Sequence, residues 1–278
     1  MRILHPTDFS QTAQSALVVA RDLRDRLDGE LHLVHVQQRF EEGRGFIRPQ
    51  LDSLNPELTR RIEEERASEV ERLRGMLGHL SSPDATHELM WGNPLQELLT
   101  LQDRFDLVVM GAHGANRIDQ FFLGGVAGRF VRRSTIPVIT VREESPTTRV
   151  RRILVATDFG EASKGAFAFA KTLAAAGIEL VLAHVVDDVR VKDDPSYIHN
   201  VTDALEALSG GTAKRLVVRE GNPARVLPPL AQEVGADLIA IGLRHHRAAA
   251  GLLLGSRADA LIRSSPVPVL NVPLAVED

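Results

Sequence analysis

The chain contains an internal repeat, and this constrains its fold more than any other feature of the sequence. Arg2–Ser10 (RILHPTDFS) returns 150 residues later as Arg152–Gly160 (RILVATDFG). Two further segments repeat in the same order, Leu33–Val36 as Leu182–Val185 at an offset of 149 and Gly92–Pro94 as Gly221–Pro223 at an offset of 129. Self-similarity at such a long period indicates that one structural unit occurs twice.

The length of 278 residues suits two domains of about 150 residues each, both large enough to bury a core. We expect domains at 1–144 and 150–275, joined by the polar stretch 143–148. The first repeat carries about twenty additional residues, which include a loop at 43–45 and a longer second helix over 56–77. The charge run 63–66 is most simply the solvated face of that helix.

Each repeat shows alternating strands and helices, which predicts an α/β fold. For the first repeat we expect a sheet of five strands, at 3–6, 30–36, 86–90, 107–110 and 137–141. Helices should begin near residues 11, 94 and 125, with the longer helix over 56–77. Continuous apolar runs such as Leu107–Met110 and Leu238–Ile241 are typical of parallel strands buried on both faces. The pattern predicts two Rossmann-like domains, each an open parallel five-stranded sheet with helices on both faces.

Composition restricts the function classes. The chain has no cysteine, so disulfides and thiolate metal sites are excluded, and we expect a cytoplasmic protein. It contains neither a signal-peptide pattern nor an apolar run long enough for a membrane span. The net charge of −4 lacks the basic excess of a nucleic-acid-binding surface. We therefore expect neither a membrane nor a nucleic acid as partner.

A glycine-rich segment follows the fourth strand of each repeat. In the first repeat, Gly111 and Gly114 are followed after nine residues by Gly124 and Gly125, at the expected start of a helix. Glycine lets the backbone approach a phosphate and adopt positive φ, and a helix N-terminus favours an anion. In the second repeat, Gly242 is followed by His245 in place of the second glycine, and then by Gly255 and Ser256. Such a loop is a weak signal alone, and tight turns without a ligand remain an alternative.

The motifs together resemble the universal stress protein family in its tandem two-domain form. The resemblance rests on the opening ILxxTDF, the LxxHV of the second strand, the GxxG-x9-G loop and the closing strands at Ile136–Val138 and Val267–Val269. It covers nearly the whole chain and implies an adenine-nucleotide α-hydrolase-like fold. In the ATP-binding branch of this family, the first-strand Asp and the second-strand Val hold adenine, and the glycine loop holds the ribose and phosphates.

The resemblance therefore implies ATP as ligand, with or without Mg²⁺, and marks a set of positions in each repeat. In the first repeat these are Pro6, Asp8, Val36, Gly111, Gly114, Gly124, Gly125 and Val126. In the second they are Asp158, Val185, Gly242, Gly255 and Ser256. We add His113 and Arg117, because they belong to the first loop and their side chains could reach a phosphate bound there.

Several of these residues have structural alternatives. Asp8 and Asp158 could instead cap the helices that follow them. For the first of these helices, Ser10 is also a natural N-cap. Arg117 could be a surface arginine. We expect His35 and His184 to be packed, hydrogen-bonded side chains rather than ligands. The histidines show no metal-ligand spacing, and no catalytic motif falls on the expected elements, so neither a metal site nor an enzyme is predicted.

The sequence thus predicts a stress-response protein in which ATP binding changes conformation or the choice of an unidentified protein partner. The alternative is an interaction scaffold whose loops bind no nucleotide. An adenylyl-transferring enzyme would need a signature such as SGGxDS after the first strand, and 7–10 lacks it. We also expect the two domains to pair through their apolar final strands, 137–141 and 267–272, and a homodimer is a further expectation.

Overall fold

The computed structural model describes residues 1–38, 56–81, 83–113, 125–142, 145–187, 194–244, 246–248, 251–253 and 256–274. In the first repeat the elements are β1 (Arg2–Pro6), α1 (Gln11–Arg26), β2 (Glu30–Gln37), α3 (Pro56–Leu80), β3 (Ala85–Trp91), α4 (Pro94–Leu101), the 3-10 turn η1 (Gln102–Arg104), β4 (Leu107–Gly111), α5 (Ala127–Val131) and β5 (Val138–Val141). In the second they are β6 (Arg152–Thr157), α6 (Glu161–Ala174), β7 (Glu179–Val186), α7 (Pro195–Ser209), β8 (Arg215–Glu220), α8 (Pro223–Val234), β9 (Leu238–Leu243), β10 (His246–Ala248), β11 (Gly251–Leu253), α9 (Ser256–Ser264) and β12 (Val269–Pro273).

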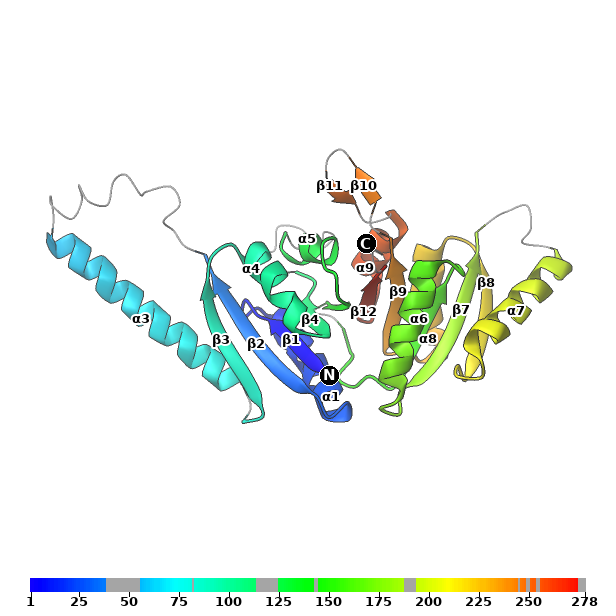
Figure 1. The fold of residues 1–278 in the computed structure, drawn as a ribbon, viewed down its shortest axis with the longest axis horizontal. Helices are drawn as coiled ribbons and strands as arrows, with labels where there is room; N and C mark the ends of the chain where they lie inside the picture. The colour runs from blue at the N-terminus through cyan, green and yellow to red at the C-terminus, as the bar shows by residue number, and fades with distance from the viewer. Residues whose placement is uncertain are drawn as a thin grey trace.

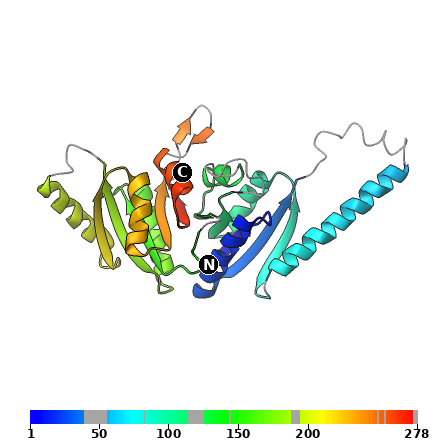
Figure 2. The same ribbon diagram turned by 180° about the vertical axis from the view of Figure 1, so that it is seen from behind.

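Ten strands form one sheet in the order β3-β2-β1-β4-β5-β12-β9-β6-β7-β8. Within this sheet the strands of each repeat pair in parallel, and the order of each half reverses beside its first strand. Figures 1 and 2 show α3 and α7 at the two outer ends of the molecule, with the two repeats meeting in the middle. The predicted α/β class and the five parallel strands per repeat are confirmed.

Both faces of the sheet are buried, as the continuous apolar strands predicted. Successive residues of a strand point to opposite faces, so Ile3 belongs to a core cluster that includes residues of α1, α3, α6 and α7, while Leu4 belongs to one that includes residues of α4, α5, α8 and α9. Each of the two core clusters includes residues of both repeats. The sheet is therefore held by cores that run across the junction between the repeats.

The repeated Gly-Asn-Pro segment begins a helix in each repeat. Gly92 and Gly221 have positive φ (154° and 120°), which favours glycine. The side chain of Asn93 accepts hydrogen bonds from the backbone N–H groups of Leu95 and Gln96, and Asn222 accepts from Ala224. Proline at the first helical position lacks only an N–H group that would have no partner inside the helix. This motif is thus fully explained by local structure.

The two repeats join through their final strands, as predicted. β5 and β12 pair antiparallel, with Thr140 opposite Val269, Ile139 opposite Leu270 and Val138 opposite Asn271. Asn271 is buried and donates hydrogen bonds from Nδ2 to the backbone oxygens of Val269 (3.0 Å) and Val138 (3.2 Å). The pairing covers two apolar edge strands, which would otherwise present unpaired backbone groups.

Two local expectations differ from the structure, and two further predicted segments lie outside the described residues. The helix expected from about Gly125 begins two residues later, at Ala127, and ends at Val131. The nine residues expected as loop in the second repeat include a small antiparallel pair, β10 and β11. The predicted loop at 43–45 and residues 143–144 of the linker lie outside the described residues.

No helix in the described part of the chain is both long enough and apolar enough to cross a membrane.

Candidate functional site

A cleft of about 610 Å³ opens beyond the carboxyl ends of β1, β2 and β4 in the first repeat; we call it cleft one. This is where the strand order of the half-sheet reverses between β1 and β4. In doubly wound sheets, ligands bind outside the carboxyl ends of the strands at such a point. Its described lining consists of Pro6, Thr7, Asp8, Ala13, Val34, His35, Val36, Gln37, Gln38, Pro94, Leu98, Met110, Gly111, His113, Gly125, Val126, Ala127 and Arg129.

The fold brings most of the residues predicted for the first site to this one cleft. Those that line it are Pro6, Asp8, Val36, Gly111, His113, Gly125 and Val126. Three further predicted residues, Gly114, Arg117 and Gly124, lie outside the described residues. Because strands far apart in the sequence supply these groups, their convergence is a property of the tertiary fold.

The Thr-Asp-Phe motif forms the turn that connects β1 to α1. The hydroxyl of Thr7 accepts a hydrogen bond from the backbone N–H of Phe9 (3.1 Å), and the carboxylate of Asp8 accepts one from Ser10 (3.1 Å). Ser10 caps α1 by accepting from Ala13 (3.2 Å), as predicted. Asp8 thus stabilises the turn before α1 but is not its cap, which is Ser10, and its exposed carboxylate also lines cleft one.

The two repeated histidines are packed and hydrogen-bonded, as expected. Nδ1 of His35 donates to the carbonyl oxygen of Thr7 (2.8 Å), and Nδ1 of His184 donates to that of Thr157 (2.8 Å). Phe9 and Phe159 pack on these imidazole rings with centroid distances of 4.6 and 4.9 Å. Both phenylalanines have φ near +60°, which is unusual for a side-chain-bearing residue. The histidine therefore fixes the turn that presents the acidic residue.

The first glycine of each loop is required by packing between a strand and a helix. A Cβ on Gly111 would lie 3.0 Å from Cγ2 of Thr12 and 3.1 Å from the backbone N of Ala13 in α1. A Cβ on Gly242 would collide with the carbonyl of Ala162 in α6. We expected a side chain here to hold the backbone away from a phosphate, but it would first collide with the neighbouring helix. At these two positions the close neighbour is the first turn of a helix.

Gly125 does not stand at a helix N-terminus, contrary to expectation. It lies in a turn two residues before α5, and α5 spans only five residues. Because the helix is so short, its dipole is weak and contributes little to phosphate binding. Arg129 of α5 lines the same cleft and was missed from the sequence. Its side chain donates a hydrogen bond to the carbonyl oxygen of Gly125, and its short distance from the loop along the chain was the available signal.

A second cleft, of about 410 Å³, occupies the corresponding place in the second repeat; we call it cleft two. Of the predicted residues, Asp158, Val185 and Gly242 line it. Ser256 begins α9 but is not part of the lining, and Gly255 and His245 lie outside the described residues. Other described lining residues include Thr157, Ser163, His184, Asp187, Arg244, Arg257 and Ala258.

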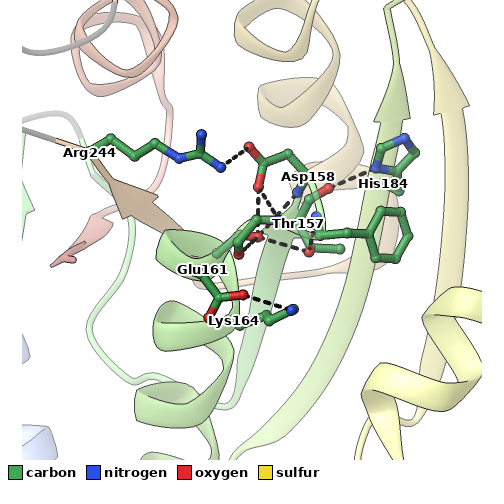
Figure 3. Close-up of polar contacts among 9 residues, drawn as sticks. Thr157, Asp158, Glu161, Lys164, His184 and Arg244 are labelled. Atoms are coloured by element: carbon green, nitrogen blue, oxygen red, sulfur yellow. Dashed lines mark hydrogen bonds and ion pairs between the residues drawn. The ribbon is translucent and has the colours of Figure 1, made fainter. Parts of the chain in front are cut away.

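Asp158 has more hydrogen-bond donors around it than a helix cap requires (Figure 3). Its carboxylate accepts from the hydroxyl of Ser163 (2.8 Å) and the backbone N–H of Gly160 (2.9 Å), and it lies 3.5 Å from the guanidinium of Arg244. Partial burial would raise the pKa of Asp158, but the hydrogen bonds from Ser163 and Gly160 and the charge of Arg244 outweigh it and hold the pKa below its ordinary value. The carboxylate is thus firmly ionised.

Two arginines of cleft two were missed from the sequence. Arg244 reaches Asp158, and Arg257 forms an ion pair with Asp187 (2.5 Å). The corresponding residues of the first repeat, aligned on its loop, are His113 and Val126. A comparison of the two loops position by position would have revealed both arginines as additions specific to the second repeat.

The described residues contain no group of three or more His, Asp or Glu side chains that could hold a metal ion. A magnesium ion that accompanies a nucleotide is commonly held by the phosphates and by water, with one or two carboxylates. A dedicated protein cage is therefore not needed for such an ion.

Comparisons of the sequence and of the structure with known proteins all point to the same family. The model of the universal stress protein family matches the chain twice, over residues 1–142 and 149–273. A universal stress protein of Mycobacterium tuberculosis (strain ATCC 25618 / H37Rv) is 27% identical over 200 residues, which are 66% of this chain and 67% of the relative. The crystal structure of a universal stress protein from Archaeoglobus fulgidus covers 98% of both chains with a TM-score of 0.68 and 24% identity.

A further family member, solved in complex with cAMP, covers 45% of this chain and 98% of its own at 25% identity and a TM-score of 0.34. The Archaeoglobus structure shows the fold, and the double match of the family model shows the family. The chain belongs to the universal stress protein family.

Proposed function

We propose that this tandem universal stress protein binds ATP in cleft one and that occupancy of the cleft changes its conformation or its choice of a protein partner. The observation that carries the proposal is the position of cleft one, outside the carboxyl ends of β1, β2 and β4 at the reversal of strand order. Its volume of about 610 Å³ falls within the range of small-molecule pockets.

The lining of cleft one offers suitable groups for each part of the nucleotide. Val36, one residue before the end of β2, lines the cleft, and the carboxylate of Asp8 is an acceptor for an amino or hydroxyl group. On the other side, Gly125 and the guanidinium of Arg129 are available for phosphate. We assign adenine to the β2 side and the phosphates to the α5 side, and Mg²⁺ enters with the phosphates.

Cleft one is preferred over cleft two for two reasons. Cleft two is smaller, and its acidic residue Asp158 already receives hydrogen bonds from Ser163, Gly160 and Arg244. The first repeat has Ala13 where the second has Ser163, so the hydroxyl donor is specific to cleft two. A nucleotide in cleft two would have to compete with these donors for the same carboxylate.

The proposed function is ligand binding rather than catalysis. The location of the protein in the cytoplasm stays a prediction. A general base that could activate water must stand within hydrogen-bond reach of it. His35, which lines cleft one, uses Nδ1 on Thr7 and places Nε2 3.2 Å from the side chain of Gln37. It therefore serves the turn.

The test is isothermal titration of ATP into the full-length chain, with mass spectrometry of any nucleotide released from freshly purified protein. We expect one ATP per chain and no comparable heat from GTP. Absence of ATP binding under conditions in which the protein is folded would refute the proposal and would favour the interaction scaffold.

A further inference from the structure

Cleft two contains two guanidinium groups that approach from different walls. Arg244 follows β9 and pairs with Asp158 at the end of β6, and Arg257 lies in the first turn of α9 and pairs with Asp187 after β7. All four charged side chains line cleft two. Figure 3 shows the side chain of Arg244 extended toward Asp158.

In the second repeat, a glycine lies next to the guanidinium of Arg244. A Cβ on Gly160 would collide with the guanidinium of Arg244, and the first repeat has Ser10 at the position of Gly160 and His113 at the position of Arg244. A serine at this position would require the flexible end of Arg244 to move. The second repeat differs from the first at both positions, and glycine leaves the present position of the guanidinium free.

Arg257 shows a similar rearrangement. The first repeat has Val126 at this position and carries its cleft arginine one turn later, at Arg129, where the second repeat has Ala260. In cleft two the cation thus stands at the first turn of the helix, at the mouth of the cleft. Asp187 replaces Gln38 and provides the carboxylate that balances it.

The described lining of cleft two carries two arginines, two aspartates and His184, whose Nδ1 is bonded to Thr157. All four charged side chains of the two ion pairs are at least 36% exposed, so solvent weakens both pairs. A ligand with several negative charges close together can replace both carboxylates as partner of the guanidiniums. An adenine nucleotide would have to compete with Ser163, Gly160 and Arg244 for the carboxylate of Asp158.

We propose that cleft two binds a compact anion of the phosphate class, held between Arg244 and Arg257, rather than an adenine nucleotide. Guanidinium groups suit phosphate because their N–H donors pair with its oxygens in a planar, two-pronged geometry. The cleft volume of about 410 Å³ accommodates such a ligand. The two repeats then have different ligand classes, and this inference does not depend on ATP binding in cleft one.

The probe is inorganic pyrophosphate, titrated by calorimetry into the nucleotide-free full-length chain at low ionic strength. We expect binding that weakens with added salt, because the interaction is between charges. In the double variant Arg244→His/Arg257→Val, which introduces the residues of the first repeat, we expect affinity to fall by about tenfold or more, since charge-assisted hydrogen bonds are lost. Melting temperature should stay near that of the unchanged protein, because both side chains are exposed.

A matched control removes the same number of arginines elsewhere. Arg215→Gln/Arg219→Gln acts on β8, where both side chains pair with Glu233 outside either cleft. We expect this control to bind pyrophosphate like the unchanged protein. Equal weakening in both double variants would indicate unspecific charge attraction and would overturn the proposal.

Two other results would also overturn it. One is the absence of pyrophosphate binding, and the other is binding that is insensitive to Arg244 and Arg257, which would place the anion elsewhere. Adenosine should not compete with pyrophosphate, and competition would mean that cleft two accepts adenine. The separate ATP titration distinguishes failure of this proposal from failure in cleft one, because the arginine variants should leave ATP affinity unchanged.

Discussion

Ile139 and Leu270, which occupy the same position in the two repeats, face each other across the antiparallel β5–β12 pair. Both side chains are fully buried, and both belong to the core cluster that spans the junction. The local axis that relates the repeats therefore passes between these two residues. The junction is a continuous part of the core, so the repeats should not unfold separately.

This relationship predicts a single cooperative unfolding transition. Leu270→Ala should destabilise the whole chain by about 2–4 kcal/mol, because it leaves a cavity in a fully buried place. Urea unfolding followed by circular dichroism and by Trp91 fluorescence should give coincident curves in both proteins. Trp91 belongs to the first repeat, so a curve in which it remains folded while the second repeat melts would show that the repeats are independent.

The loop glycines should affect stability before they affect ligand binding. Gly242→Ala should cost about 1–3 kcal/mol, because the new methyl group meets the backbone of α6 and the helix must shift. Gly111→Ala should cost less, since its closest neighbour is a side-chain methyl at 3.0 Å.

The control is Gly165→Ala, at a helical position of α6 with no atom within 4 Å, which should stabilise by about 0.5–1 kcal/mol. Denaturant midpoints compare the three variants. If Gly242→Ala were as stable as the unchanged protein, the strand and helix would lie further apart than described.

Asp8 should contribute to both folding and ligand binding, and two variants can separate these roles. Asp8→Asn retains a side-chain oxygen that can accept from the N–H of Ser10 but removes the charge. Asp8→Ala removes both, and should weaken ATP binding by about 1–3 kcal/mol if the carboxylate accepts a hydrogen bond from the nucleotide.

Ser10→Ala is the matched structural control, because it removes the cap of α1 while leaving the carboxylate in place. It should lower stability by about 1 kcal/mol and leave ATP affinity unchanged. Calorimetric titration and thermal melting measure the two effects. A loss of ATP affinity in Ser10→Ala equal to that in Asp8→Ala would mean that Asp8 acts only through the turn.

His5 should make the stability of the protein depend on pH. It is fully buried in β1, where Nδ1 donates to the carbonyl oxygen of Val109 (2.8 Å) and Nε2 has no partner among the described residues. Burial is the main cause that lowers the pKa of His5 from 6.5 to about 4. In the unfolded chain the imidazole takes up a proton near pH 6.5, so acid favours unfolding.

The stability associated with neutral His5 is present above pH 6.5 and is lost as the pH falls toward about 4, by about 3 kcal/mol in total. His5→Val introduces the residue that the second repeat has at this position, Val155. Urea unfolding between pH 4 and 7.5 should show a shallower pH dependence for the variant. An identical pH dependence in both proteins would mean that other groups cause it.

The sequence by itself determined the repeat, the order of strands and helices, and the local motifs. These depend on residues close together in the chain: the cap by Ser10, the Gly-Asn-Pro helix starts, and the hydrogen bond from the N–H of Phe9 to the hydroxyl of Thr7. The burial of the central strands on both faces also follows from sequence, because a continuous apolar run places apolar side chains on each face. The pairing of the final strands could be predicted since their apolar edges must be covered.

Only the tertiary structure decided which charges meet and why particular residues are small. Arg244 and Asp158 are 86 residues apart and meet because β6 and β9 are neighbours in the sheet. Gly242 must be a glycine because α6 crosses it closely, and Gly160 leaves space for the guanidinium of Arg244. Such contacts depend on distances between elements, which a linear pattern does not contain. The physical reason is that local hydrogen bonds are set by the chain itself, whereas side-chain partners across a cleft are set by how the strands and helices pack.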